Sequence, residues 1–296
     1  MVVDVFTDTA LQGNPLAVFP DAPDIDGATM QRIARELNLS ETVFVSAPDG
    51  PDALASVRIF TPMQELRFAG HPTIGTAFVL TELGRVPPDA QSIVLSEGVG
   101  PVPVRLERRA DPFLGWLRTP PITFGRTFDP EACARASGLS PSVLLDAPPQ
   151  IVSAGNPFLF VALRDPGMVD SVALDLAALE RAVPPTETTG HFVFAPVQGG
   201  GGGSGGGAYS RMFAARAGIA EDPATGSGTG PLAAYMTRYG LVPLRDGGQF
   251  TSTQGVHMGR PSKLHVILHA RAGTLDFVEV GGSAVRLIDA TLTLPA

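Results

Sequence analysis

The chain has 296 residues, of which 44% are hydrophobic and 17% charged, so it can bury one large core or two ordinary ones. Its 21 Lys and Arg against 29 Asp and Glu leave a formal net charge of −8, and no basic run interrupts that balance. Nucleic acid and anionic membrane surfaces are therefore poor partners.

A single cysteine, Cys133, excludes an internal disulfide, a multi-cysteine zinc site and a catalytic cysteine pair. We interpret it as structural. Asp4 and Asp8 stand where a secretory signal would need basic and then apolar residues, and no apolar run approaches the roughly 20 residues of a membrane-spanning helix. We therefore expect a cytoplasmic protein that does not associate with membranes.

The first half of the chain predicts short strands alternating with helices. Strand-like runs are expected at residues 2–6, 16–19, 42–45 and 56–60. A helix capped by Asp26 is expected because the apolar residues at 30, 33, 34 and 37 share one helical face. A second, very apolar helix is expected over 74–83, ended by Gly84.

The second half of the chain repeats short sequence motifs of the first half in the same order. The matches are Gly13-Asn14-Pro15-Leu16 with Gly155-Asn156-Pro157-Phe158, residues 42–48 with 190–196, Arg58-Ile59-Phe60 with Arg211-Met212-Phe213, and His71-Pro72 with Asp222-Pro223. Because the matches keep their order and nearly their separation, they predict two similar lobes.

We expect an N-terminal lobe over residues 1–118 and a C-terminal lobe over 119–285, with a strand near 286–296 as a candidate to complete the first. The helices at 74–83 and 232–239 are apolar nearly all round, so each belongs inside its lobe. Strands wrapped around a central helix are the architecture that this pattern favours.

Residues 199–207 are all glycine except Ser204. The tract lies between the strands expected around Phe192 and Met212, and it lacks the Lys-Ser/Thr and the helix start of a phosphate-binding loop. We interpret it as a flexible hairpin loop with little effect on stability.

Ser40 and Glu41 lie where a helix gives way to an apolar strand, so the Glu41 carboxyl is expected against hydrophobic surface. Desolvation there would raise its pKa, and a carboxyl with a pKa nearer neutral can take up and return a proton. A solvated loop glutamate is the common alternative. The ordered elements on both flanks favour the catalytic interpretation.

Gly70 and His71 open the first apolar helix, and Asp222, Gly226 and Ser227 open the second. Helix starts present free backbone N–H groups and a positive dipole end, so they suit a small carboxylate. The simpler alternative makes His71 and Asp222 N-caps, each followed by proline at the first helical position. Their matched places in the two halves favour a shared cleft.

Metal binding has little support in the sequence. The histidines are His71, His191, His257, His265 and His269. The last two are four residues apart, but apolar residues alternate with them, which is strand periodicity, and no carboxylate lies close in sequence.

Several separated motifs resemble one known family. They are Ser40-Glu41-Thr42, RIFTPMQELRFAGHPTIGTA (58–77), EDPATGSGTGPLAAY (221–235), QGVHMGRPS (254–262) and the opening DVFTDTALQGNPLAVF (4–19). At these motifs the chain resembles the PhzF family of phenazine-biosynthesis-like proteins. The resemblance implies the diaminopimelate-epimerase-like fold of α+β class: two pseudo-symmetric lobes, each a curled, mainly antiparallel sheet around a central helix, with the site between the lobes.

The resemblance also implies a cofactor-free isomerase or epimerase in which Glu41 moves a proton between substrate carbons. It assigns His71 and Asp222 as further catalytic residues, and it assigns substrate binding to Ser40, Gly70, Gly226 and Ser227. In the related epimerases two cysteines stand at the places of Gly70 and Ser227, which this chain cannot match. The departures are Arg67 for a usual proline, Gly228 for a common alanine, and the glycine tract.

We therefore expect a PhzF-like isomerase, a homodimer, that uses no cofactor or metal and acts on a small carboxylate-bearing metabolite. The alternative is a non-catalytic small-molecule-binding or regulatory protein on the same scaffold, since a fold does not fix a function. No Gly-x-Ser-x-Gly elbow and no Gly-x-Gly-x-x-Gly fingerprint joins a strand to a helix, which disfavours a hydrolase or a dehydrogenase.

Overall fold

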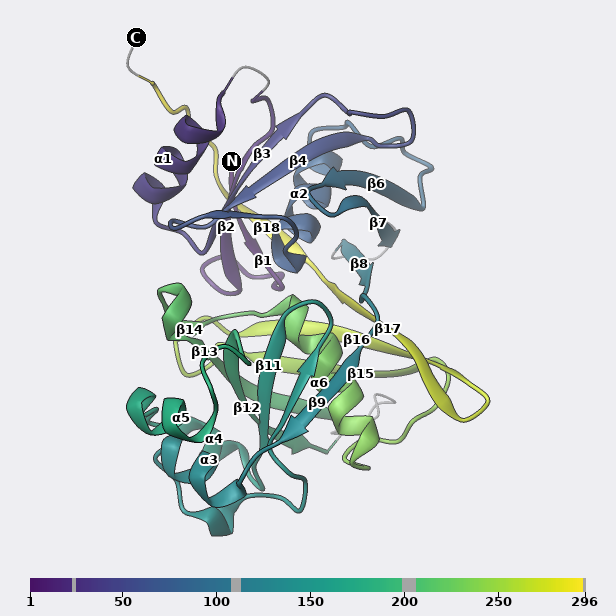
Figure 1. The fold of residues 1–296 in the computed structure, drawn as a ribbon. Coiled ribbons are helices and arrows are strands. Elements are labelled where there is room, and N and C mark those ends of the chain that lie inside the picture. Colours follow the sequence, from purple (N-terminus) through teal and green to yellow (C-terminus); the bar gives the residue numbers. More distant parts are fainter. Residues whose placement is uncertain (23–24, 108–112, 199–205, 295–296) are drawn as a thin grey trace. The chain divides into compact units, whose positions relative to one another are not determined.

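The computed structural model describes residues 1–22, 25–107, 113–198 and 206–294 (Figure 1). Contacts between Cα atoms divide the chain into unit 1, Met1–Leu117 with Gly282–Ala296, and unit 2, Arg118–Gly281. Most of the glycine tract, residues 199–205, falls outside the described residues, so its expected flexibility stays a prediction.

Unit 1 is a sheet with two helices. Its strands are β1 (Val2–Val5), β2 (Asn14–Phe19), β3 (Glu41–Ser46), β4 (Ala55–Phe60), β5 (Glu65–Leu66), β6 (Ser92–Glu97), β7 (Gly100–Glu107), β8 (Leu114–Arg118) and β18 (Ala284–Ile288). Its helices are α1 (Gly27–Leu37) and α2 (Gly70–Glu82). Hydrogen bonds join the strands in the order β18-β1-β2-β3-β4-β6-β7-β8, with the short β5 also on β4. The pairs β2–β3 and β4–β6 are parallel and the others antiparallel.

Unit 2 adds more helices to a sheet of the same kind. Its strands are β9 (Thr123–Thr127), β10 (Gln150–Ser153), β11 (Pro157–Ala162), β12 (Gly190–Val197), β13 (Gly207–Ala214), β14 (Ile219–Asp222), β15 (Gly248–Gln254), β16 (Ser262–Arg271) and β17 (Thr274–Gly282). Its α-helices are α3 (Pro130–Ala136), α4 (Pro166–Asp170), α5 (Leu176–Ala182) and α6 (Gly226–Arg238), with 3-10 turns at Pro141–Val143 and Ala215–Ala217.

The strand order of unit 2 repeats that of unit 1. The order is β9-β10-β11-β12-β13-β15-β16-β17, with β14 on β13, and the parallel pairs are again the third with the fourth strand and the fifth with the sixth. The predicted α+β class and internal repeat are confirmed, and both sheets are mainly antiparallel.

The hydrogen-bond register of the strands shifts one of the motif matches, that of residues 42–48 with 190–196, by one residue. Leu16 pairs with Glu41 in unit 1, and its counterpart Phe158 pairs with Gly190 in unit 2. The two matched arginines show the same one-residue difference. Arg58 pairs with Phe44, whereas Arg211 pairs with Val193 and not with Phe192, the residue that the match aligns with Phe44. The match of residue 42 with 190 is therefore wrong, and the residue of unit 2 that corresponds to Glu41 is Gly190.

The helix starts correct a second match. Helix α2 begins at Gly70 after the N-cap Ala69, and α6 begins at Gly226 after the N-cap Thr225. His71 therefore lies inside the first turn of α2, whereas Asp222 is the last residue of β14. Neither is an N-cap, so the simpler alternative is wrong, and Gly70 corresponds to Gly226.

Each sheet buries one face on its long apolar helix. In α2 every residue from Gly70 to Leu80 is buried, and in α6 every residue from Gly228 to Met236 is buried. Helix α6 begins six residues before the expected 232 because its first turn is glycine-rich rather than apolar. In unit 2 the rings of Phe160 and Phe194 pack on Tyr235 of α6.

The other face of each sheet carries the remaining helices. In unit 1, Phe44 and Phe60 pack with buried residues of α1, which Asp26 caps as predicted by accepting from the Thr29 amide at 2.9 Å. In unit 2, Val193 and Phe213 pack with α3, α4 and α5. Among the described residues, no helix is long and apolar enough to cross a membrane.

Candidate functional site

The first turn of α2 brings His71 to Glu41. Glu41 is the first residue of β3, and since Phe44 faces α1, the alternation of the strand turns Glu41 to the face that carries α2. The Nε2 atom of His71 lies 3.3 Å from Oε2 of Glu41, and the two side chains are 6% and 12% exposed. Two of the residues predicted to be catalytic therefore meet in a nearly dry environment within unit 1.

The His71 imidazole is neutral at pH 7. Burial lowers the pKa of His71 from 6.5 to about 3 because a charged ring loses its hydration there. Desolvation dominates even with the Glu41 carboxyl 3.3 Å away, because only 6% of the His71 side chain is exposed. A neutral imidazole can donate one N–H and accept one hydrogen, so it can share a proton with a neighbouring group.

A second buried carboxyl supports the start of α2. The Thr73 hydroxyl lies 2.7 Å from the carbonyl oxygen of Ala69 and 2.6 Å from Oε1 of Glu97, the last residue of β6. Burial raises the pKa of Glu97 to about 8, because a charged carboxylate would lose its hydration there. At pH 7 Glu97 is therefore protonated.

The single hydroxyl hydrogen of Thr73 cannot serve two acceptors fully at once. With Glu97 protonated, its carboxyl donates to the Thr73 hydroxyl oxygen, and the Thr73 hydroxyl donates to the Ala69 carbonyl oxygen. Each of the two accepting oxygens then receives one hydrogen. Residues 69 to 73, which include His71, are thereby tied to β6. No sequence pattern indicates Glu97 as a supporting residue, because only the fold brings β6 to this turn.

In unit 2, Asp222 belongs to a buried hydrogen-bond network. The Thr225 hydroxyl donates to Oδ2 of Asp222 at 2.6 Å, and Nε2 of Gln254 donates to the Asp222 carbonyl oxygen at 2.7 Å. The same Nε2 lies 2.9 Å from the Thr225 hydroxyl, and the Thr225 amide donates to Oε1 of Gln254 at 3.3 Å. The network holds the loop between β14 and α6 against the end of β15.

Gln254 is a supporting residue that the site prediction omitted. It is the first residue of the QGVHMGRPS motif (254–262). The next residue, Gly255, has a φ of +76°, and a Cβ atom there would lie 2.6 Å from the carbonyl oxygen of Pro223. A glycine at this position lets the loop approach the backbone beside Asp222.

The remaining predicted residues occupy the expected elements. Gly70 is the first residue of α2, Gly226 and Ser227 are the first two of α6, and Ser40 directly precedes β3. Gly226 and Ser227 are partly exposed and the residues after them are buried, so the start of α6 is the accessible part of the helix. Free amides at such starts suit an anion.

Arg67, which stands where the family usually has proline, has a role in the structure. Its Nε and Nη2 donate to the Gly98 carbonyl oxygen at 3.1 and 2.9 Å, and the Val99 amide donates to the Arg67 carbonyl oxygen at 3.1 Å. Arg67 therefore joins the segment before α2 to the turn between β6 and β7, directly beside Glu97.

His265 and His269 lie on strand β16 as predicted, and His269 stacks on Phe277 with Nε2 2.9 Å from Oε2 of Glu279. Cys133 is buried in α3. Within the residues that the structure describes, no three His, Cys, Asp or Glu side chains gather as a metal site would require.

Comparison with known proteins identifies the family. The family model described as phenazine biosynthesis-like protein matches residues 3–290. The chain belongs to this family. It is 36% identical over 286 residues to the trans-2,3-dihydro-3-hydroxyanthranilate isomerase of Pseudomonas aeruginosa, covering 96% of this chain and 95% of that one. The isomerase of the same name from Pseudomonas fluorescens is 36% identical and covers 99% of both chains.

Solved structures agree with the family. A predicted epimerase from Pseudomonas aeruginosa superposes with a TM-score of 0.79 at 33% identity, covering 99% of this chain and 98% of that one. A PhzF-family protein from Bacillus anthracis reaches a TM-score of 0.84 at 23% identity over 96% and 95% of the chains, which shows a shared fold. The predictions of a PhzF-like fold and of an isomerase with a small-molecule substrate are confirmed.

Proposed function

We propose that this PhzF-like isomerase catalyses proton transfer between two carbons of one substrate molecule, with Glu41 as the group that carries the proton. The observation behind the proposal is the contact of Glu41 with His71 at 3.3 Å, where both side chains are almost fully buried. A buried carboxyl beside a neutral imidazole is suited to accept and return a proton.

The reaction needs no net change in charge. The Glu41 carboxylate takes a proton from one substrate carbon, and the electron pair of the broken C–H bond moves into the substrate. The protonated carboxyl then returns the proton to another carbon, and the enzyme is regenerated. His71 acts as a neutral donor toward Glu41 or the substrate, because its lowered pKa of about 3 excludes an imidazolium at pH 7.

The other predicted residues are proposed to bind the substrate. Ser40 and Gly70 provide polar groups in unit 1, and Gly226 and Ser227 provide the free amides at the start of α6 in unit 2. We propose that Asp222, held by Thr225 and Gln254, is a further catalytic residue that orients an amino or hydroxyl group of the substrate.

We propose trans-2,3-dihydro-3-hydroxyanthranilate, or a close relative with a carboxylate on a partly reduced ring, as the substrate. The support is that two relatives named for this activity are 36% identical over nearly the whole chain. The compound bears the carboxylate, amino and hydroxyl groups that the proposed binding residues suit.

The test is turnover of that compound in D2O by the purified protein and by Glu41→Gln. The amide keeps the size of the side chain but cannot carry a proton, so we expect the rate to fall by a factor of roughly 10² to 10⁴. Glu131→Gln is the matched control, because Glu131 pairs with Arg135 on the exposed surface of α3. Its rate should equal that of the unchanged protein.

The outcomes separate the parts of the proposal. Full activity of Glu41→Gln contradicts the role of Glu41. Absence of turnover by the unchanged protein, with ligand-induced stabilisation still present, contradicts the substrate or favours the non-catalytic alternative. Incorporation of deuterium from solvent distinguishes these, since a pure binding protein would exchange no substrate hydrogen.

We further propose that the enzyme works in the cytoplasm and as a homodimer. Cys133 is the only cysteine, so the chain needs no oxidising compartment for disulfide formation. Light scattering on the purified protein tests the second part, which requires twice the mass of one chain. Fractionation of the producing cells tests the first.

A further inference from the structure

A buried ion pair in unit 2 stands directly before Asp222. Arg211 lies on β13 and Glu221 on β14, one residue before Asp222. Nε of Arg211 donates to Oε1 of Glu221 at 2.9 Å, Nη2 donates to Oε2 at 2.7 Å, and the two side chains are only 7% and 13% exposed. Two parallel bonds between a guanidinium and a carboxylate form a fork that fixes the direction of both groups.

The third nitrogen of the guanidinium extends this pair to α4. Nη1 of Arg211 donates to three backbone carbonyl oxygens at the end of that helix and just after it, those of Val169 at 3.3 Å, Asp170 at 3.2 Å and Val172 at 3.0 Å. All three nitrogens of the guanidinium are therefore engaged, and Arg211 ties β14 to α4.

Unit 1 has the same ion pair at the equivalent positions. Nε and Nη2 of Arg58 donate to Oε1 and Oε2 of Glu65 at 2.7 and 2.8 Å. The next residue is Leu66, which corresponds to Asp222 because each pairs with the residue after the matched arginine. The Arg58 and Glu65 side chains are 42% and 43% exposed. The pair is therefore buried in the unit where a carboxylate follows it, and half exposed in the unit where a leucine does.

The alternation of side chains along β14 links the pair to the direction of Asp222. Since Arg211 reaches α4, Glu221 lies on the face of the sheet that carries α4, and its neighbour Asp222 points to the opposite face, which carries α6. The register between β13 and β14 shifts between Met212 and Ala214. Because such an irregularity disrupts the backbone ladder, the side-chain fork supplies a constraint that the ladder lacks.

Stability alone does not account for a buried ion pair. Both charges lose their hydration, and an apolar pair of similar volume is often as stable or more so. The fork adds one defined arrangement, which matters where the neighbouring group must meet a substrate. We propose that Arg211 and Glu221 are positioning residues that hold the Asp222 carboxylate in its working direction. The proposal rests on the proposed function, in which Asp222 orients an amino or hydroxyl group of the substrate.

The test compares Glu221→Gln with Glu65→Gln, the same change at the equivalent pair. Glutamine keeps the size of the side chain but loses the charge and one acceptor of the fork. Turnover of trans-2,3-dihydro-3-hydroxyanthranilate by fully folded Glu221→Gln should fall at least about tenfold, because small displacements of a group that orients a substrate lower the rate strongly. Glu65→Gln should stay within about twofold, since its pair is half exposed and precedes Leu66.

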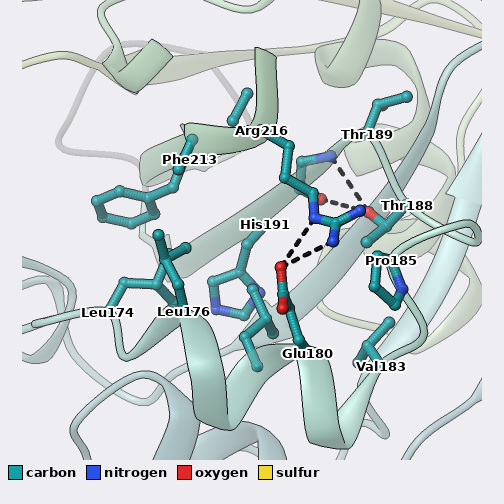
Figure 2. A pocket seen from close by; sticks show the side chains of 14 residues that line it. Leu174, Leu176, Glu180, Val183, Pro185, Thr188, Thr189, His191, Phe213 and Arg216 are labelled. Carbon is teal, nitrogen blue, oxygen red and sulfur yellow. Dashed lines mark hydrogen bonds and ion pairs between the residues drawn. The ribbon is translucent and has the colours of Figure 1, made fainter. Parts of the chain in front are cut away.

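A second control lies in the connection between β13 and β14. Nε and Nη2 of Arg216 lie 3.0 and 2.8 Å from Oε1 of Glu180, and these side chains are 55% and 48% exposed (Figure 2). Arg216 comes before β14, whereas Asp222 is the last residue of that strand. Glu180→Gln therefore removes an exposed ion pair of unit 2 without touching the fork, and it should leave turnover unchanged.

Arg211→Lys tests the fork from the other side and decides the question if Glu221→Gln does not fold. Lysine keeps the positive charge but has a single terminal nitrogen, so it cannot form the two parallel bonds. Turnover should fall at least about tenfold, whereas Arg58→Lys should stay within about twofold.

A measurement without substrate separates this proposal from the proposed function. The Thr225 hydroxyl donates to Oδ2 of Asp222, so part of the loss in urea midpoint that Thr225→Val causes comes from that bond. If the fork holds Asp222 in place, this loss should shrink by about half when Thr225→Val is combined with Glu221→Gln, and it should stay the same when it is combined with Glu65→Gln.

The proposal fails if folded Glu221→Gln turns over substrate as fast as the unchanged protein, or if Glu65→Gln is impaired equally. It also fails if Thr225→Val lowers the urea midpoint equally in both backgrounds, because the ion pair then contributes to stability without holding Asp222. If the unchanged protein does not turn over the compound, the proposed substrate is wrong, and the comparison of the Thr225→Val effects decides the positioning role by itself.

Discussion

Glu41 and Gly190 occupy the same place in the two units, as the first residue of the fourth strand in each sheet. Each pairs with a residue of the parallel strand beside it, Leu16 in one case and Phe158 in the other. At Gly190 a Cβ atom would lie 2.9 Å from Sδ of Met212 and 3.1 Å from Cδ1 of Phe158. Only unit 1 can therefore hold a carboxyl here, and the repeat is asymmetric at its most important position.

This crowding predicts that Gly190→Ala destabilises the protein. The added methyl group must displace Met212 or the Phe158 ring, so we expect a loss of about 1–3 kcal/mol in the free energy of unfolding by urea. Gly50→Ala is the control, because a Cβ there meets nothing within 4 Å, and it should stay within about 0.5 kcal/mol. Equal effects of the two changes would contradict the packing argument.

The raised pKa of Glu97 predicts a loss of stability as the pH rises from about 4.5 to about 8. The folded protein holds the proton up to about pH 8, whereas the unfolded chain releases it near the ordinary value of 4.5. The folded state therefore binds more protons between these values, and stability falls as pH rises from about 4.5 to about 8.

Glu97→Gln isolates this contribution. The amide can still donate to the Thr73 oxygen but cannot ionise, so the difference in unfolding free energy between variant and unchanged protein should grow in favour of the variant as pH rises toward 8. Glu107→Gln, at the exposed ion pair with Arg105, serves as the control and should follow the unchanged protein. A pH-independent difference for Glu97→Gln would show that Glu97 is ionised in the fold.

His71 predicts the opposite dependence on the acid side. Its folded pKa of about 3 lies below the ordinary 6.5, so the unfolded chain takes up a proton first and stability is lost as pH falls from about 6.5 to about 3. Between pH 6.5 and 5 this amounts to about 1–2 kcal/mol. His191 acts in the same direction with a pKa of about 4.

The measurement compares urea unfolding of His71→Asn and of His257→Asn at several pH values. The first variant should lose less stability on acidification than the unchanged protein. The second removes a ring that is 46% exposed and should leave the acid dependence as it was. If both variants behave alike, the buried ring of His71 is not the source of the effect.

Thr225→Val tests the network around Asp222. Valine keeps the shape but removes a hydroxyl that donates to Asp222 at 2.6 Å and lies 2.9 Å from Nε2 of Gln254, so about 1–3 kcal/mol of stability should be lost. If Asp222 orients substrate, turnover should fall as well. Thr237→Val, near the other end of α6, is the control, and it should leave turnover unchanged.

Much of this protein could be predicted from the sequence, because local patterns and repeated words are properties of the chain itself. The spacing of apolar residues gave the helix that Asp26 caps, and the histidines of β16 followed from strand alternation. The motif around Glu41 and the one around His71 indicated the family and the isomerase, which the relatives confirm.

The tertiary structure decided which residues meet. Two motif matches were wrong, Gly190 for Thr42 and Asp222 for His71, because similar short motifs can be displaced by a residue or more. Only the hydrogen bonds between strands and the observed helix starts fix which residues correspond. Glu97 on Thr73, Gln254 on Asp222 and His191 on Ser137 are contacts between segments far apart in the chain. Burial and hydrogen bonding at such contacts depend on packing in three dimensions, which no local pattern encodes.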